Sequence, residues 1–270
     1  MIFPRSRALN RTLGTIRASF LLAMRQFLAD PQWIIPMLVA PFFFTLVSVV
    51  LYNVNSGEQL LYVEVGGSAM GMWATVVYGP GQSLGFDRWN GTLTPTLLAP
   101  TNLVWVVSGR VFWYALVGLL SSLSVFAAGL LWLGASLTFV SVPLLALGAV
   151  VGFVSLSAFG ILLSSAYLLT RNAVYIQNGL ELPLYILTGT MFPVTLLSQF
   201  PRLVGFALGP TWAIDAVRLA ALPTYRTIGF GYLTDLAISM GETTAYFVLA
   251  LFVFQRIERR TRSEGTLEKV

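Results

Sequence analysis

Residues 142–169 read VPLLALGAVVGFVSLSAFGILLSSAYLL, a run without a single Asp, Glu, Lys or Arg. A membrane hydrocarbon core about 30 Å thick is crossed by roughly 20 apolar residues in a helix, so this run is long enough to span it. The whole chain has the same character, with 10% charged residues, 56% hydrophobic residues and a mean hydropathy of +0.78. Soluble domains carry about 25% charged residues. The sequence therefore predicts an all-α integral membrane protein.

Five further runs are apolar enough to cross a membrane, and shorter polar segments separate them. The six predicted transmembrane helices cover residues 34–52, 61–84, 103–133, 142–169, 174–192 and 233–254. The chain has 270 residues and no long polar insertion, so we expect residues 1–270 to form a single transmembrane domain.

Two segments outside these runs are also predicted to touch the membrane. In residues 1–32, apolar side chains recur on one helical face and arginines lie on the other, which predicts an interfacial amphipathic helix. An ordinary buried helix is the alternative. Residues 193–232 are apolar but are interrupted by four prolines, so each piece is too short to cross. We expect short re-entrant helices there, between the fifth and sixth spans.

The distribution of basic residues predicts the orientation. An even number of spans places both termini on one side, and all but three of the sixteen basic residues then lie on that side. Basic loops are typical of the cytoplasmic face, so residues 1–32, 85–102 and 255–270 are predicted to be cytoplasmic. The three exceptions are Arg202, Arg218 and Arg226. The net charge of +5 therefore reflects topology, and we expect no nucleic-acid partner.

The composition also excludes several kinds of chemistry. Cys and His are absent, which removes thiolate nucleophiles, histidine bases and Cys/His metal sites, so no catalytic residue, cofactor or metal is expected in this chain. The single lysine is Lys269, so a phosphate-binding loop of the G-x-x-x-x-G-K-[ST] type cannot form. Any use of ATP must therefore occur on another polypeptide.

The predicted cytoplasmic loop 85–102 contains FDRWNGTLTPTLLAP at residues 86–100. Gly91 permits a sharp bend, and Thr94 followed by Pro95 predicts the start of a helix of one or two turns. The apolar Leu93, Leu97 and Leu98 are unusual in a cytoplasmic loop, and they suggest a surface that docks into a partner. A solvated loop is the alternative interpretation.

This loop resembles the cytoplasmic segment of ABC-2 type transporter permeases. The residues that match are Asp87, Arg88, Gly91, Thr92, Leu93, Leu97 and Pro100. The chain departs from that pattern at Thr94, where an acidic residue is common, and at Pro95, which interrupts a helical position. Two later elements resemble the same family, and they contain Gly189, Phe192 and Pro193, then Pro210, Asp215 and Arg218.

The resemblance implies a permease subunit of an ABC exporter, similar to drug-resistance and polysaccharide-export permeases, in the cell (inner) membrane of a bacterium or archaeon. It implies two partners besides membrane lipid: a separate ATP-binding cassette ATPase subunit, which binds ATP and Mg, and a second permease copy in a homo- or heterodimer. Residues 85–102 would then be the coupling helix. The cargo expected is amphipathic, lipid-like or drug-like.

Glu181 is predicted to lie in the middle of the fifth span, near Gln177 and Asn178. A charge at the bilayer centre costs about 2.5–3.5 kcal/mol on insertion scales, so Glu181 must be paired, hydrated or protonated. These three residues are candidates for a translocation path or a dimer interface, and a structural hydrogen bond between helices is the alternative. An ion- or proton-coupled secondary transporter would use Glu181 as its coupling carboxylate.

The remaining acidic residues suggest no chemistry. Glu64 is expected to reach water near the outer end of the second span, and Asp215 is expected to pair with Arg218 three residues later. Asp235 and Glu242 are too far apart along one helix to share a proton, so a membrane-embedded transferase is disfavoured.

Overall fold

The computed structural model describes residues 5–30, 34–51, 53–54, 56–99, 101–132, 139–170 and 173–264. Every regular element within these residues is a helix, as the apolar runs predict. The helices are α1 (Arg5–Ala29), α2 (Ile34–Leu51), α3 (Gly57–Trp89), α4 (Leu93–Leu98), α5 (Leu103–Trp132), α6 (Val142–Leu169), α7 (Ala173–Leu187), the 3-10 turn η2 (Val194–Leu196), α8 (Gln199–Phe206), α9 (Gly209–Ala221) and α10 (Tyr232–Glu264).

Four of these helices, α3, α5, α6 and α10, are long and apolar enough to cross a membrane. The other two predicted spans are shorter, with 18 residues in α2 and 15 in α7. At 1.5 Å per residue they extend about 27 Å and 22 Å, less than the hydrocarbon core. The fifth run was expected to continue to residue 192, but α7 ends at Leu187. The six-span count stays a prediction.

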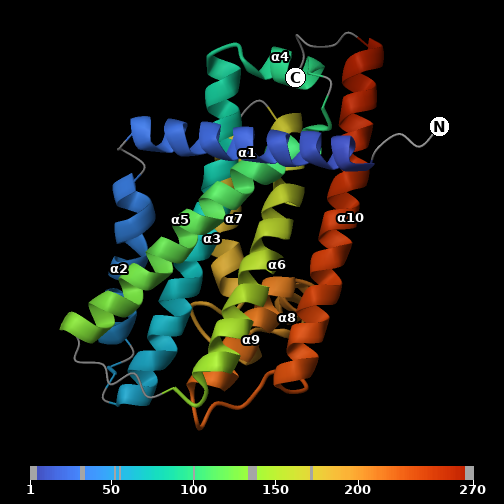
Figure 1. The fold of residues 1–270 in the computed structure, drawn as a ribbon. Coiled ribbons are helices and arrows are strands. Elements are labelled where there is room, and N and C mark those ends of the chain that lie inside the picture. The colour runs from blue at the N-terminus through green and yellow to red at the C-terminus, as the bar shows by residue number, and fades with distance from the viewer. Residues whose placement is uncertain are drawn as a thin grey trace.

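Helix α1 lies across one end of the bundle, nearly perpendicular to the long helices, and α4 lies at that same end (Figure 1). In α1, Ala23 and Phe27 are buried against α5, and Phe27 meets Trp113 and Tyr114 edge to face. Arg17 and Arg25 of α1 are exposed. The predicted amphipathic face therefore packs on the protein itself. The membrane contact of α1 stays a prediction.

Helices α8 and α9 lie at the opposite end of the bundle and are bent by 87° at residues 207–208 (Figure 1). Neither helix is long enough to cross alone, as the prolines predict. The re-entrant arrangement of this bent pair stays a prediction.

Helix α3 is the central element of the bundle. The hydroxyl of Ser56 caps its first turn by accepting a hydrogen bond from the Gln59 backbone N–H, and the helix packs against α2, α5, α6, α7 and α9. The second span was expected to end at residue 84, but α3 continues to Trp89 because Ser83 and Asp87 face α5 and make hydrogen bonds there. The loop predicted to be cytoplasmic is therefore shorter than the sequence suggests.

Candidate functional site

The segment between α3 and α5 forms a tight turn followed by a short helix. Gly91 adopts a φ of +70°, so the sharp bend expected at this glycine is confirmed. Helix α4 has six residues, within the predicted one or two turns. Its predicted start at Thr94 is wrong, because α4 begins at Leu93 and the Thr92 hydroxyl bonds back to Asp87 rather than capping the helix. Pro100 lies outside the described residues.

Asp87 is buried at the end of α3 and forms an ion pair with Arg110 of α5. The other carboxylate oxygen of Asp87 accepts a hydrogen bond of 3.2 Å from the Gln26 side chain of α1. Arg110 was missed as a site residue. A signal did exist, because an arginine within an apolar run requires a buried partner, and Asp87 is predicted to lie on the same side of the membrane.

Ser83 completes this buried polar cluster. Its hydroxyl donates to the Gln26 side chain at 2.7 Å and accepts from Arg110 at 3.1 Å. The three helices α1, α3 and α5 are therefore joined through Gln26, Ser83, Asp87 and Arg110. The next residue, Arg88, donates to the carbonyl oxygens of Leu168 and Thr170 at the end of α6. Those helix-end carbonyls have no partner within their own helix, so Arg88 satisfies them.

The expectation that Leu93 and Leu97 face outward as docking anchors is wrong. Each is 6% exposed, and both belong to the hydrophobic core that includes Leu103 and Phe254. A six-residue helix lying on the end of a bundle turns one face inward, and the apolar spacing of four residues selects that face. The exposed apolar side chains here are instead Trp89 at 88%, Leu98 at 54% and Phe86 at 45%. The coupling role of the segment stays a prediction.

Glu181 on α7 is held by two tyrosines. Its carboxylate accepts hydrogen bonds from Tyr78 of α3 at 2.6 Å and from Tyr185 at 2.7 Å. The Tyr78 hydroxyl also lies 2.9 Å from Asn178 Oδ1. Glu181 is half-buried, while Asn178 and Leu182 beside it are exposed on this chain. The face of α7 that carries Glu181 is therefore partly uncovered, with polar Asn178 beside apolar Leu182.

Gln177 does not share that face, although the sequence grouped it with Asn178 and Glu181. It is fully buried, and its amide donates to the carbonyl oxygens of Val77 and Tyr78 on α3. Pro80 leaves the carbonyl of Val76, four residues earlier in α3, without its helical donor, and Gln177 bonds to the two carbonyls that follow it. The contact of Gln177 is a packing contact between α3 and α7.

The outer elements Gly189 to Pro193 and Pro210 to Arg218 lie at the end of the bundle opposite α1. Gly189 has a φ of +75° just beyond the end of α7, and Phe192 and Pro193 follow it before η2. Pro210 lies in the first turn of α9, where the missing N–H would be unpaired in any case. These residues therefore shape the turns that connect α7, α8 and α9.

Asp215 and Arg218 do not pair with each other, so that expectation is wrong. The Asp215 carboxylate accepts hydrogen bonds of 2.6 Å from both Tyr225 and Thr227, while Arg218 donates to the Thr190 carbonyl and stacks 4.1 Å above the Tyr62 ring. Burial raises the pKa of the Tyr225 hydroxyl, which keeps it a donor to Asp215. The carboxylate of Asp215 is thus hydrogen-bonded to the segment that follows α9.

Glu64 was expected to reach water, but it is fully buried where α3 meets Gly129 of α5. Neither carboxylate oxygen has a hydrogen-bond partner among the described residues. Within the same part of the chain, no cluster of three or more Asp and Glu side chains is placed to hold a metal ion.

No protein-family model and no curated protein matches this chain. The resemblance to ABC-2 permeases therefore stays a prediction. The structure has two candidate sites. One is the turn after α3, which the Asp87–Arg110 ion pair anchors at one end of the bundle. The other is the hydrogen-bonded carboxylate of Glu181 on α7.

Proposed function

We propose that this chain is the permease subunit of an ABC exporter, with six spans, both termini cytoplasmic, and ATP hydrolysed by a separate subunit. The observation that carries this proposal is that residues 86–99 are hydrogen-bonded to other helices on one side and expose apolar side chains on the other. Their inward side is bonded to α1, α5 and α6 through Asp87 and Arg88. Their outward side exposes Trp89 and Leu98, two large apolar residues beside polar Asn90.

Such a segment suits the transfer of motion from one protein to another. A flexible solvated loop would absorb a displacement, whereas a turn bonded to three helices passes it to the bundle. Exposed Trp is strongly enriched among the residues that dominate the binding energy of protein interfaces. In this proposal Trp89 and Leu98 contact the ATPase subunit, and the Asp87–Arg110 pair conveys the displacement to α5.

The partly uncovered face of α7 supports the proposed second permease copy. A carboxylate that faced lipid would be costly, so the Glu181 face requires either water or a protein partner. The same observation favours the second candidate function, a secondary transporter in which Glu181 carries the coupled proton or ion. The two candidates differ in their requirement for an ATPase.

The first test replaces Trp89 and Leu98 together with Ser. We expect the purified complex to retain at least tenfold less ATPase subunit, because burying each apolar side chain is worth about 1.5–3 kcal/mol and 1.4 kcal/mol is a factor of ten. The measurement is co-purification of a co-expressed ATP-binding cassette subunit, together with ATP-dependent cargo export from vesicles.

The matched control replaces Phe230 and Leu233 together with Ser. These two residues are also an exposed aromatic and an exposed leucine, and they lie at the other end of the bundle. The control should keep the ATPase subunit. Normal co-purification and export by the Trp89→Ser, Leu98→Ser variant would remove the main support for an ATP-driven permease.

The second test replaces Glu181 with Gln, which keeps the shape of the side chain and removes its charge. We expect cargo export to fall about tenfold while insertion and yield are unchanged, because the Gln amide has one acceptor oxygen where the carboxylate accepts from both Tyr78 and Tyr185, and one such hydrogen bond contributes about 1.5 kcal/mol. Export is measured in vesicles with ATP alone, with a proton gradient alone, and with both.

Thr244→Ala, at an exposed polar residue of α10, serves as the control and should leave export unchanged. Unchanged export by Glu181→Gln would make Glu181 a structural residue. Export driven by the gradient alone, and lost in this variant, would favour the secondary transporter.

A further inference from the structure

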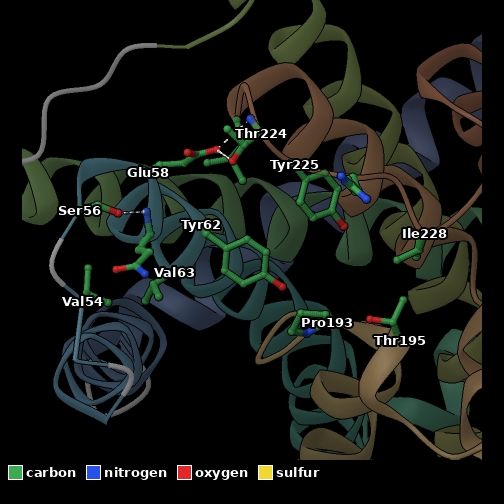
Figure 2. Close-up of a pocket in the computed structure, with 13 residues that line it drawn as sticks. Val54, Ser56, Glu58, Tyr62, Val63, Pro193, Thr195, Thr224, Tyr225 and Ile228 are labelled. Atoms are coloured by element: carbon green, nitrogen blue, oxygen red, sulfur yellow. Dashed lines mark hydrogen bonds between the residues drawn. The ribbon is translucent and has the colours of Figure 1, made fainter.

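A cavity of about 650 Å³ opens at the end of the bundle opposite α1, between the start of α3 and the segment 222–231. Figure 2 shows Tyr62 and Tyr225 beside each other within it, with Pro193 and Thr195 beyond them. The two tyrosine rings are 6.2 Å apart between centroids. This volume is typical of pockets that enclose a small organic ligand.

The three basic residues that the sequence places apart from all the others gather at this cavity. Arg226 is exposed and forms part of the cavity wall. Arg218 is buried behind the wall and stacks on Tyr62, and Arg202 donates to the Thr195 carbonyl at 2.5 Å. None of the three arginines forms an ion pair with a described carboxylate.

The acidic residues nearby have other partners. Glu58 accepts hydrogen bonds from the backbone and hydroxyl of Thr224, and Asp215 accepts them from Tyr225 and Thr227. Asp235 accepts one from the Phe230 backbone. All three carboxylates therefore hold the segment 222–231 in place as one wall of the cavity. The exposed Arg226 remains available to a negatively charged ligand, while Arg218 and Arg202 already donate to backbone carbonyls.

The rest of the cavity wall combines polar residues (Ser56, Glu58, Gln59, Thr195 and Thr224) with apolar and aromatic ones. Val63 of α3, Pro193, Leu222 and Ile228 contribute hydrocarbon surface between the two tyrosines and the opening. A small soluble anion would leave this surface unfilled. A ligand with an apolar part would bury it and gain roughly 25 cal/mol per Å² of apolar area removed from water.

We propose that this cavity binds an amphiphile with an anionic headgroup. The headgroup lies against Arg226, with the buried charge of Arg218 behind it, and the apolar part lies between Tyr62 and Tyr225. Charge-assisted hydrogen bonds from guanidinium to phosphate or carboxylate are about twice as strong as neutral ones, which makes the headgroup charge decisive.

The test titrates the purified chain, held in a neutral detergent, with dihexanoyl phosphatidylglycerol, dihexanoyl phosphatidylcholine and glycerol phosphate, and counts bound ligand by native mass spectrometry. We expect phosphatidylglycerol to bind about tenfold more tightly than either of the others.

Arg226→Gln should remove that preference. The Arg226 side chain makes no hydrogen bond or ion pair within the described residues, so folding should not suffer. Val63→Trp fills the cavity and should abolish binding.

Arg256→Gln is the matched control, an exposed arginine near the far end of α10 that should leave binding unchanged. Equal binding of the two phospholipids would overturn the role of charge, and equal binding of glycerol phosphate would overturn the role of the apolar part. Unchanged binding by Arg226→Gln would place the ligand elsewhere. No ATPase or nucleotide is present, so failure here leaves the proposed permease function intact.

Discussion

Replacing Asp87 with Asn is expected to lower the free energy of unfolding by about 3–5 kcal/mol. Asn keeps the size and shape of the side chain, so the change removes only the negative charge. The Arg110 guanidinium is 1% exposed, and its ion-pair partner is Asp87. Without that partner a positive charge remains buried, and an uncompensated buried charge is far more costly than a broken surface ion pair.

The unfolding of the detergent-solubilised chain, followed by circular dichroism against denaturant or temperature, measures this loss. A second variant, Asp87→Asn with Arg110→Met, removes both charges and should recover most of the stability, because Met fills the space without a charge. A loss below about 1 kcal/mol for Asp87→Asn would mean that the pair behaves as an exposed one and does not anchor α3 to α5.

Gly109→Ala is expected to destabilise the chain by about 3 kcal/mol, at the top of the usual range for overpacking. A Cβ atom at this position of α5 would lie 2.9 Å from Ser19 Cβ and 3.0 Å from the Phe20 backbone nitrogen, and it would also collide with the Ile16 carbonyl oxygen. Backbone atoms of α1 cannot move aside without shifting the whole helix. The substitution should therefore displace α1 from the bundle.

Gly85→Ala is the control, and it is expected to raise the stability of the chain rather than lower it. Gly85 also lies within a helix, but an added Cβ there meets nothing within 4 Å. This variant should be stabilised by roughly 0.5–1 kcal/mol, because alanine has the better helix propensity. Denaturant unfolding and the rate of trypsin cleavage at Arg17 and Arg25 both measure the effect. Equal stability of the two alanine variants would show that α1 does not pack tightly on α5.

The helical class, the approximate helix positions and the bend at Gly91 follow from the sequence alone. These features depend on neighbours a few residues apart: apolar run length selects a helix in a membrane, proline interrupts it, and glycine tolerates a positive φ. The lengths of α3 and α7 were less well predicted. Composition does not reveal that α3 extends past Asp87, whose carboxylate pairs with Arg110 of α5. It also does not reveal that the chain turns at Gly189, just beyond the end of α7.

Side-chain partners were decided by tertiary structure. The sequence suggested that Asp215 pairs with Arg218 because they are three residues apart, yet Asp215 binds Tyr225 and Thr227. Glu64 was expected in water, yet it is buried against α5. Charged groups of a folded chain bind whichever donors the packing of distant helices brings near, and local spacing cannot rank those choices.

The candidate coupling segment shows the same division. Its place between two spans, its matching residues and its short helix were all readable in the sequence. Which face of that helix points outward was not, because Leu93 and Leu98 have equal hydrophobicity and only the core beneath α4 distinguishes them. The sequence by itself determined that a stiff turn exists here, and the packing of α4 against α3 and α10 decided that Leu93 and Leu97 face inward while Leu98 faces outward.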